Sequence, residues 1–255
     1  MPNVEKHQRE NKILLGFLER PALNWLAVHM PAWVTPDTMT WLGIIASLMI
    51  FISYSLTHLN PNFLWLASLG FILNWMGDSL DGTLARHRHI ERPRYGFLID
   101  HWVDAISTLL IFMGLGLSPY VDLTVACLGI IAYLLLSIMV YLITYVTGVF
   151  NIANVGMGPT EIRVLAILLN TAIFFIGNPT FNLPYFGATS LYTLIVAVLS
   201  LLMFIYFMVN TGLQARRLAL LDQKRLDRRI AKEKKEQEIA EDSRQVNQGD
   251  HPISN

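Results

Sequence analysis

The chain alternates between long apolar runs and short polar segments. A helix that crosses a bilayer needs about 20 largely apolar residues. Six runs reach or approach this length: residues 39–57, 63–81, 97–117, 123–149, 162–176 and 190–211. We therefore predict an all-α fold, a polytopic membrane protein with six transmembrane helices.

The segments that flank these runs predict two further helices. Residues 13–33 carry leucines, a phenylalanine and tryptophans, interrupted by charges and a proline, as is typical of a helix lying in the membrane interface. Residues 214–241 are dense in both charge signs, which favours a solvated helix extending from the last span over a partner-binding helix. We expect residues 242–255 to be disordered. The predicted parts are an N-terminal cytoplasmic and interfacial segment (1–35), a six-helix transmembrane domain (36–213) and a charged C-terminal helix with its tail (214–255).

Composition excludes several classes of protein. Hydrophobic residues make up 53% of the 255 residues and charged residues 15%, against about 25% charged in ordinary soluble domains. This balance argues against a disordered chain and a routine cytosolic enzyme. The 19 basic and 19 acidic residues cancel, so we expect no nucleic-acid partner. The single cysteine, Cys127, can form neither an internal disulfide nor a thiolate metal site.

The distribution of basic residues predicts the orientation in the membrane. All 19 lysines and arginines lie before the first run, between the second and third, after the sixth, or at Arg163, which marks the connection after the fourth. The other three connections contain none. Because lysine and arginine collect on the cytoplasmic side, we predict six spans with both termini cytoplasmic, in a bacterial inner membrane.

Four aspartates lie within the second and third apolar runs. Asp78 and Asp81 are three residues apart and Asp100 and Asp104 are four apart, so each pair shares one face of its helix. The two helices are joined by a short basic loop and are therefore antiparallel neighbours. At the rise of an α-helix, all four carboxylates lie about 7–15 Å from that loop. We expect them to converge in one pocket that opens to the cytoplasm.

Charge repulsion requires that something neutralise these carboxylates, because no lysine or arginine lies in the two helices at that depth. Either the pairs hold protons or they hold divalent cations. A site built of aspartate oxygens suits Mg²⁺ or Mn²⁺, and two such ions would attract a diphosphate. The alternative is a six-helix cation transporter that uses the acids as an ion path.

The residues between Asp78 and Asp104 carry a known pattern. They read Asp78-Ser79-Leu80-Asp81-Gly82-Thr83-Leu84-Ala85-Arg86, then Gly96, Asp100 and Asp104. This resembles the signature DxxDGxxAR…GxxxDxxxD of the CDP-alcohol phosphotransferase (CDP-alcohol phosphatidyltransferase) superfamily, with all eight fixed positions matched. The resemblance implies an enzyme of phospholipid synthesis that displaces CMP from a CDP-alcohol by a second alcohol, using two divalent ions. A motif-bearing relative without activity is a further alternative, although no signature residue is missing.

The resemblance also implies the role of each matched residue. Asp78, Asp81 and Asp100 would be the principal metal ligands, and Asp104 would lie close to the metals and act as general base. Gly82, Ala85 and Arg86 would receive the cytidine diphosphate; for Gly82, helix packing is the alternative. The partners would be a CDP-alcohol, a lipid or polar alcohol and membrane lipids, and homodimers are usual in the family.

Shorter strings are similar to the choline and ethanolamine phosphotransferase branch. These are Gly158-Pro159-Thr160-Glu161 and the pair Asp100-His101. Glu161 and His101 are therefore candidates for substrate selectivity, and His101 is alternatively a polar neighbour packed against the site. An acid at Glu161 would balance an amine but oppose a phosphate, which favours a CDP-aminoalcohol donor and a diacylglycerol acceptor. The alternative is a CDP-diacylglycerol-dependent phosphatidyltransferase.

A string at the first span is a weaker match. Pro36-Asp37-Thr38-Met39-Thr40 resembles the family's PNxxT, with Asp37 in place of the asparagine. Helix capping by Asp37 or Thr38 is a simpler interpretation than a nucleotide role for Thr40.

Overall fold

The computed structural model describes residues 16–147, 159–184 and 187–249. Packing divides the chain into two units, Met1–Phe207 and Met208–Asn255. The elements are α1 (Gly16–His29), α2 (Pro36–Leu56), α3 (Phe63–His87), α4 (Pro93–Gly116), α5 (Leu123–Thr147), α6 (Pro159–Ile176), β1 (Thr180–Leu183), β2 (Gly187–Ser190) and α7 (Leu191–Gly249).

Six helices of the described chain, α2 to α7, are long and apolar enough to cross a membrane. Within the first unit, many large apolar side chains are exposed on the outside of the helices, such as Leu142 at 60% and Leu202 at 56%. An outward apolar surface of this kind suits contact with lipid rather than water. The predicted all-α polytopic fold is confirmed, and the protein is an integral membrane protein.

Local sequence explains where the helices near the site begin. Thr35 is the N-cap of α2; its hydroxyl accepts from the Thr38 backbone N–H, and the Thr38 hydroxyl accepts from the Thr35 N–H. Pro36 and Pro93 occupy first-turn positions of α2 and α4, where a missing N–H does no harm. The expectation that Asp37 or Thr38 caps α2 is therefore right only for Thr38, as the partner of Thr35.

Two glycines let the backbones of α2 and α3 approach each other closely. A Cβ on Gly77 of α3 would lie 2.5 Å from the backbone N of Gly43 and 2.7 Å from the Met39 carbonyl oxygen on α2. Only a residue without a side chain lets the two backbones approach so closely. α2 packs most extensively on α3 and next on α4, while α5 packs on α4 and both α1 and α6 on α3.

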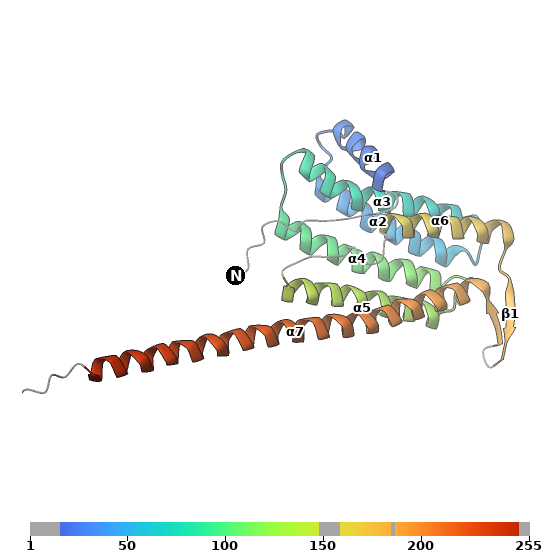
Figure 1. Ribbon diagram of the computed structural model, residues 1–255. Helices are drawn as coiled ribbons and strands as arrows, with labels where there is room; N and C mark the ends of the chain where they lie inside the picture. Colours follow the sequence, from blue (N-terminus) through green and yellow to red (C-terminus); the bar gives the residue numbers. More distant parts are fainter. Residues whose placement is uncertain (1–15, 148–158, 185–186, 250–255) are drawn as a thin grey trace, which may run out of the picture. The chain divides into compact units, whose positions relative to one another are not determined.

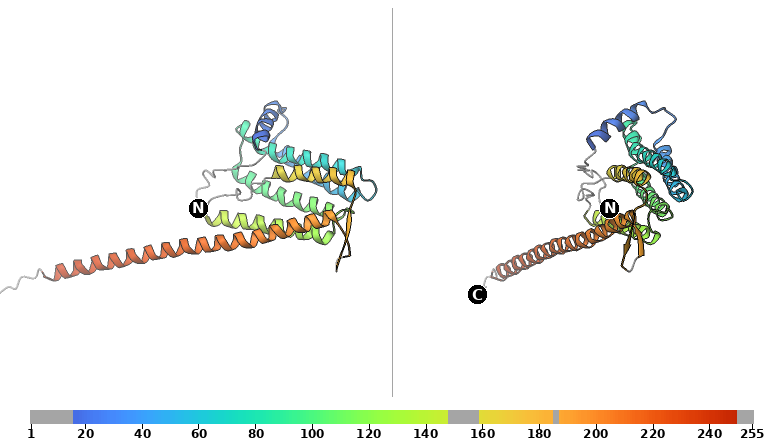
Figure 2. Two further views of the ribbon diagram at one scale, coloured as in Figure 1. Left: turned by 45° about the vertical axis from the view of Figure 1, so that its right-hand side comes forward. Right: turned by 90° about the vertical axis from the view of Figure 1, so that its right-hand side faces the viewer.

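Different connections lie at the two ends of the helices in the first unit. The loop between α3 and α4 lies at the same end of the helices as α1, whereas the α2–α3 and α4–α5 turns and the β hairpin lie at the opposite end (Figures 1 and 2). A cluster of Leu23 and Ala27 on α1 with Leu80 and Leu84 on α3 is buried at the α1 end. α1 lies within the predicted interfacial segment 13–33.

The connection before α7 contains structure that the sequence analysis did not predict. β1 and β2 pair antiparallel, with Thr180 opposite Ser190 and Leu183 opposite Gly187. The hairpin is the one sheet in the described part of the chain.

The second unit contains the charged end of α7. Its side chains are mostly exposed as far as residue 237, and Arg229 pairs with Glu233 one turn on, at 3.0 Å. The helix is continuous from the apolar span, in accord with the predicted charged extension. It continues to Gly249, so the predicted disorder is wrong for residues 242–249; residues 250–255 lie outside the described part.

Candidate active site

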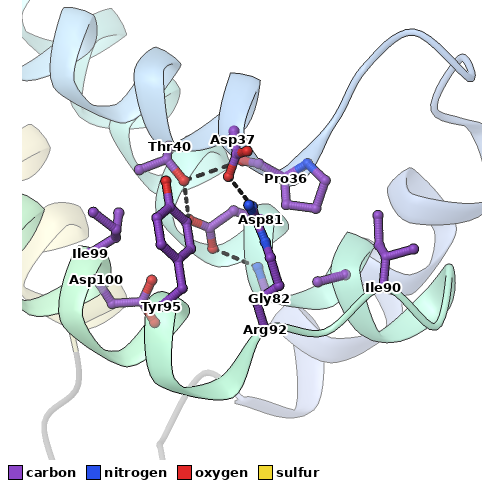
Figure 3. A pocket seen from close by; sticks show the side chains of 12 residues that line it. Pro36, Asp37, Thr40, Asp81, Gly82, Ile90, Arg92, Tyr95, Ile99 and Asp100 are labelled. Atoms are coloured by element: carbon purple, nitrogen blue, oxygen red, sulfur yellow. Dashed lines mark hydrogen bonds and ion pairs between the residues drawn. The ribbon is translucent and has the colours of Figure 1, made fainter.

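A pocket lies where the beginnings of α2 and α4 meet the end of α3 (Figure 3). It is lined by Pro36, Asp37, Thr40, Asp81, Gly82, Ala85, Ile90, Arg92, Tyr95, Gly96, Ile99 and Asp100. Asp81 from α3 and Asp100 from α4 face this one space. The pocket is therefore acidic, and it is formed by the segment that the sequence motif covers together with the beginning of α2.

Asp81 is fixed by two donors. The Thr40 hydroxyl donates to Oδ2 at 2.9 Å and the Gly82 backbone N–H donates to Oδ1 at 2.5 Å. Both donors hold the carboxylate in place and stabilise its charged form. Thr40 was set aside in favour of capping residues in the sequence analysis, but the structure places it against a motif aspartate.

Asp78 lies one turn deeper on α3 and does not line the pocket. Its Oδ2 accepts from Nη2 of Arg163 at 2.8 Å, while Nε of Arg163 donates to the Asn74 side-chain oxygen at 2.8 Å. Arg163 belongs to α6 and its side chain is only 12% exposed. No lysine or arginine lies in α3 or α4 at this depth, but helix packing brings Arg163 to Asp78 from a distant part of the sequence.

Asp104 lies on α4, one turn beyond Asp100. Tyr133 and Tyr141 of α5 lie within electrostatic range of it, and Tyr133 is also within range of Asp78. His101 packs between Phe97, at 4.1 Å between ring centroids, and Tyr141, at 4.7 Å. His101 is therefore held by one aromatic ring of its own helix and one of α5.

The glycine and alanine of the motif face the pocket. A Cβ on Gly82 would meet nothing but the guanidinium of Arg86, 3.3 Å from Nη1. Helix packing therefore does not require glycine at this position. Ala85 also lines the pocket, whereas Arg86 folds back over Gly82 and donates to the Thr83 hydroxyl at 3.2 Å.

One side of the pocket carries a basic residue that the sequence analysis did not single out. Arg92 forms an ion pair with Asp37 across the pocket, and its guanidinium lies 4.3 Å from the ring centroid of Tyr95 (Figure 3). Asp37, which stands where the family pattern has an asparagine, is thus paired with the guanidinium of Arg92. Gly96 is open on the same side, since nothing lies within 4 Å of a Cβ placed there.

A glutamate of α1 contacts two helices next to the site. Glu19 accepts hydrogen bonds from Trp75 Nε1 at 3.1 Å and Ser79 Oγ at 3.0 Å on α3, and from Thr160 Oγ1 at 2.9 Å on α6. Ser79 follows Asp78, and Thr160 precedes Glu161, which is half-buried in the first turn of α6. α1 therefore holds the beginning of α6 against the aspartate-bearing helix.

The donor set suits a hard divalent cation. Asp81 and Asp100 line the same pocket, and Asp81 is within electrostatic range of Asp78 as well. Among the described residues, no three His, Cys, Asp or Glu side chains are gathered into a ready metal site. The carboxylates are of the right chemistry and on facing helices, but Asp78 is turned to Arg163.

The residues that sequence reasoning missed are Arg163 as a partner of Asp78, together with Asn74, Thr40, Arg92, Glu19 and Tyr133. Two carried a usable signal, because Asn74 is a polar residue inside an apolar run and Thr40 ends a string similar to a family motif. The others act through contacts between segments far apart in the chain.

These features define a polytopic membrane protein with an acidic pocket at one end of its helix bundle. A family model described as CDP-alcohol phosphatidyltransferase matches residues 33–214, which is most of the chain. The chain belongs to this family, whose members transfer phosphate-containing groups.

Curated relatives include two proteins named cholinephosphotransferase 1. The one from Danio rerio is 26% identical over 174 residues, 64% of this chain and 45% of the relative. The one from Homo sapiens is 26% identical over 213 residues, 78% of this chain and 48% of the relative. A CDP-diacylglycerol–serine O-phosphatidyltransferase from Encephalitozoon cuniculi is 31% identical over 131 residues, 46% of this chain and 34% of the relative. The chain thus spans about half the length of the cholinephosphotransferases that it matches.

Proposed function

We propose that this protein transfers a substituted phosphate from a CDP-alcohol to an acceptor alcohol and releases CMP. The observation that carries the proposal is the pocket that Asp81 and Asp100 line together with Gly82, Ala85 and Gly96. Carboxylates supply the acidic side, and residues without bulky side chains leave room for a nucleotide close to the helix backbone. The competing transporter hypothesis has no comparable support, because the chain belongs to a transferase family.

Two divalent cations, Mg²⁺ or Mn²⁺, complete the proposed site. Asp78, Asp81 and Asp100 would be the principal ligands, with Asp104 close by. The ions would supply electrophilic stabilisation of the diphosphate and of the departing CMP. Thr40 and the Gly82 N–H hold Asp81 in a fixed orientation, and a preorganised ligand is worth more than a mobile one. Gly82, Ala85 and Arg86 would receive the CDP moiety.

Asp104 is the proposed general base. It takes the proton from the acceptor hydroxyl while the hydroxyl oxygen forms the new bond to the phosphorus that carries the donor alcohol. The bond from that phosphorus to the CMP oxygen breaks, and CMP leaves with the electron pair. No covalent intermediate is needed. Tyr133 and Tyr141 of α5 lie within electrostatic range of Asp104.

We further propose a CDP-aminoalcohol, CDP-choline or CDP-ethanolamine, as donor and a diacylglycerol as acceptor. The relatives named cholinephosphotransferase support this choice. Glu161 is the acidic residue in the first turn of α6. An acid there favours an amine over a phosphorylated acceptor. His101 would affect selectivity only by packing beside the site.

A substrate panel tests the proposal. The purified protein in lipid vesicles is given CDP-choline or CDP-ethanolamine with diacylglycerol, and separately CDP-diacylglycerol with serine, glycerol phosphate or inositol phosphate. CMP release with the first set supports the assignment. Release only with the second set would identify a phosphatidyltransferase like the Encephalitozoon relative. Glu161→Gln should lower the CDP-aminoalcohol reaction more than Mn²⁺ binding.

A further inference from the structure

Arg163 is a charged side chain held inside the helix bundle. Its side chain is 12% exposed, and it pairs with Asp78, whose side chain is 28% exposed. Its Nη1 is the one buried side-chain nitrogen or oxygen without a hydrogen-bond partner among the described residues. Charges within membrane helices are costly and usually functional. A guanidinium with one unsatisfied donor is not explained by structural stability alone.

A polar network holds the guanidinium of Arg163 in addition to Asp78. Nε of Arg163 donates to Asn74 Oδ1 at 2.8 Å. The side-chain nitrogen of Asn74 donates to the Gly43 carbonyl oxygen at 3.1 Å and to Ser47 Oγ at 2.9 Å. Ser47 is in turn bonded to Ser107 at 2.8 Å. The position of Arg163 is therefore supported by α2, α3 and α4 and does not depend on Asp78 alone.

Two positive partners compete for the Asp78 carboxylate. Its Oδ2 neutralises Arg163 in the structure, and the same carboxylate is a ligand in the proposed metal site. A divalent cation at Asp78 would stand next to the guanidinium, and two like charges repel strongly where water is scarce. Metal binding and the ion pair therefore oppose each other.

We propose that Arg163 is the resident counter-cation of Asp78, so that divalent metal binds at Asp78 by exchange with the guanidinium. This inference rests on the proposed function, because it takes Asp78 as a metal ligand. The exchange leaves Arg163 without its anion, while Nη1 already lacks a partner. A diphosphate in the site adds negative charge and offsets that loss. Arg163 therefore weakens the binding of metal alone and couples it to binding of the diphosphate.

Mn²⁺ binding to the purified full-length protein tests the exchange without any need for turnover. Free Mn²⁺ is measured by electron paramagnetic resonance, with and without CDP, in the wild type, Arg163→Gln and Arg163→Lys. We expect Arg163→Gln to bind Mn²⁺ alone about tenfold more tightly, which corresponds to about 1.4 kcal/mol of binding free energy. Arg163→Lys keeps the charge and should bind Mn²⁺ alone as weakly as the wild type. CDP should tighten Mn²⁺ binding about 5–150-fold in the wild type, and by less in Arg163→Gln.

Controls separate the possible outcomes. Arg217→Gln removes one positive charge at an exposed position and should change neither affinity. If Arg163→Gln folds poorly, Arg163→Met repeats the test, and Mn²⁺ should raise the Tm of the neutral variant more than that of the wild type. Unchanged or weaker Mn²⁺ binding in a folded neutral variant would overturn the exchange and leave the proposed function intact. A wild type that binds no Mn²⁺, with or without CDP, would overturn both.

Discussion

At the scale of single residues, the two aspartates of α4 have different surroundings. Asp100 lines the pocket with Asp81, whereas Asp104 lies one turn away, within electrostatic range of Tyr133 and Tyr141. This separation suggests that substrate binding and proton transfer depend on different carboxylates.

Asp104→Asn should therefore separate binding from chemistry. A positioned general base contributes about 10²–10⁴-fold to the rate, so kcat should fall by at least this factor while much of the CDP-alcohol affinity remains. Asp81→Asn, the matched variant at the pocket, should lose affinity for both metal and substrate. Single-turnover CMP release and equilibrium binding measure the two effects. Near-normal turnover of Asp104→Asn would exclude it as the base.

Gly77 and Gly82 both lie on α3, but Gly77 contacts the backbone of α2 whereas Gly82 lines the pocket. Gly77→Ala would drive a Cβ into the backbone of α2, because the nearest atom would be 2.5 Å away; overpacking of this kind costs about 1–3 kcal/mol. Gly82→Ala meets only the flexible end of Arg86 and should fold normally but bind CDP-alcohol more weakly. Thermal unfolding and substrate affinity, measured on both variants, should show opposite patterns. A loss of stability equal to that of Gly77→Ala would mean that Gly82 serves packing.

At the scale of elements, α1 is attached at both ends. Glu19 accepts from Trp75, Ser79 and Thr160, and the guanidinium of Arg88 donates to the carbonyl oxygens of Met30 and Pro31, just after the helix, at 3.1 and 2.9 Å. Such contacts make α1 part of the helix bundle that carries the pocket rather than a separate membrane anchor.

Glu19→Ala should loosen α1 and the beginning of α6. The three donors lose their acceptor, and each lost hydrogen bond is worth about 1 kcal/mol. Hydrogen exchange of residues 16–29 and 159–163 should become faster. Glu233→Ala, which removes an exposed one-turn ion pair in α7, should leave both segments unchanged. Unaltered exchange in Glu19→Ala would contradict the attachment.

Sequence patterns predict some elements and contacts better than others. The six spans follow from hydropathy, and Asp78 to Asp104 stand out because charges are rare in apolar helices. The Arg163–Asp78 contact joins residues 85 positions apart, and the Glu19–Thr160 contact joins residues 141 apart, so neither leaves a local periodic signal. The β hairpin is made of two four-residue strands, too short for a clear alternation.

At the scale of the whole molecule, the account depends on which side of the membrane the pocket opens. The sequence predicts that the basic α3–α4 loop faces the cytoplasm, where soluble CDP-alcohols are available.

Single cysteines in a Cys127→Ser background test this orientation. Asn60→Cys and Asn182→Cys lie in exposed connections at the end opposite α1 and should react with an impermeant thiol reagent added outside. Glu91→Cys and Gln237→Cys are also at exposed positions and should react only after the membrane is opened. The reverse pattern would place the pocket on the wrong side for the proposed substrates.

The most direct test of the account is the metal dependence of CMP release by the purified protein. With CDP-choline or CDP-ethanolamine and diacylglycerol, CMP should appear in Mg²⁺ or Mn²⁺, stop in excess EDTA and resume when the metal is restored. Asp81→Asn should release none under any of these conditions. Full CMP release in excess EDTA, or undiminished release by Asp81→Asn, would contradict a metal-dependent transfer in this pocket.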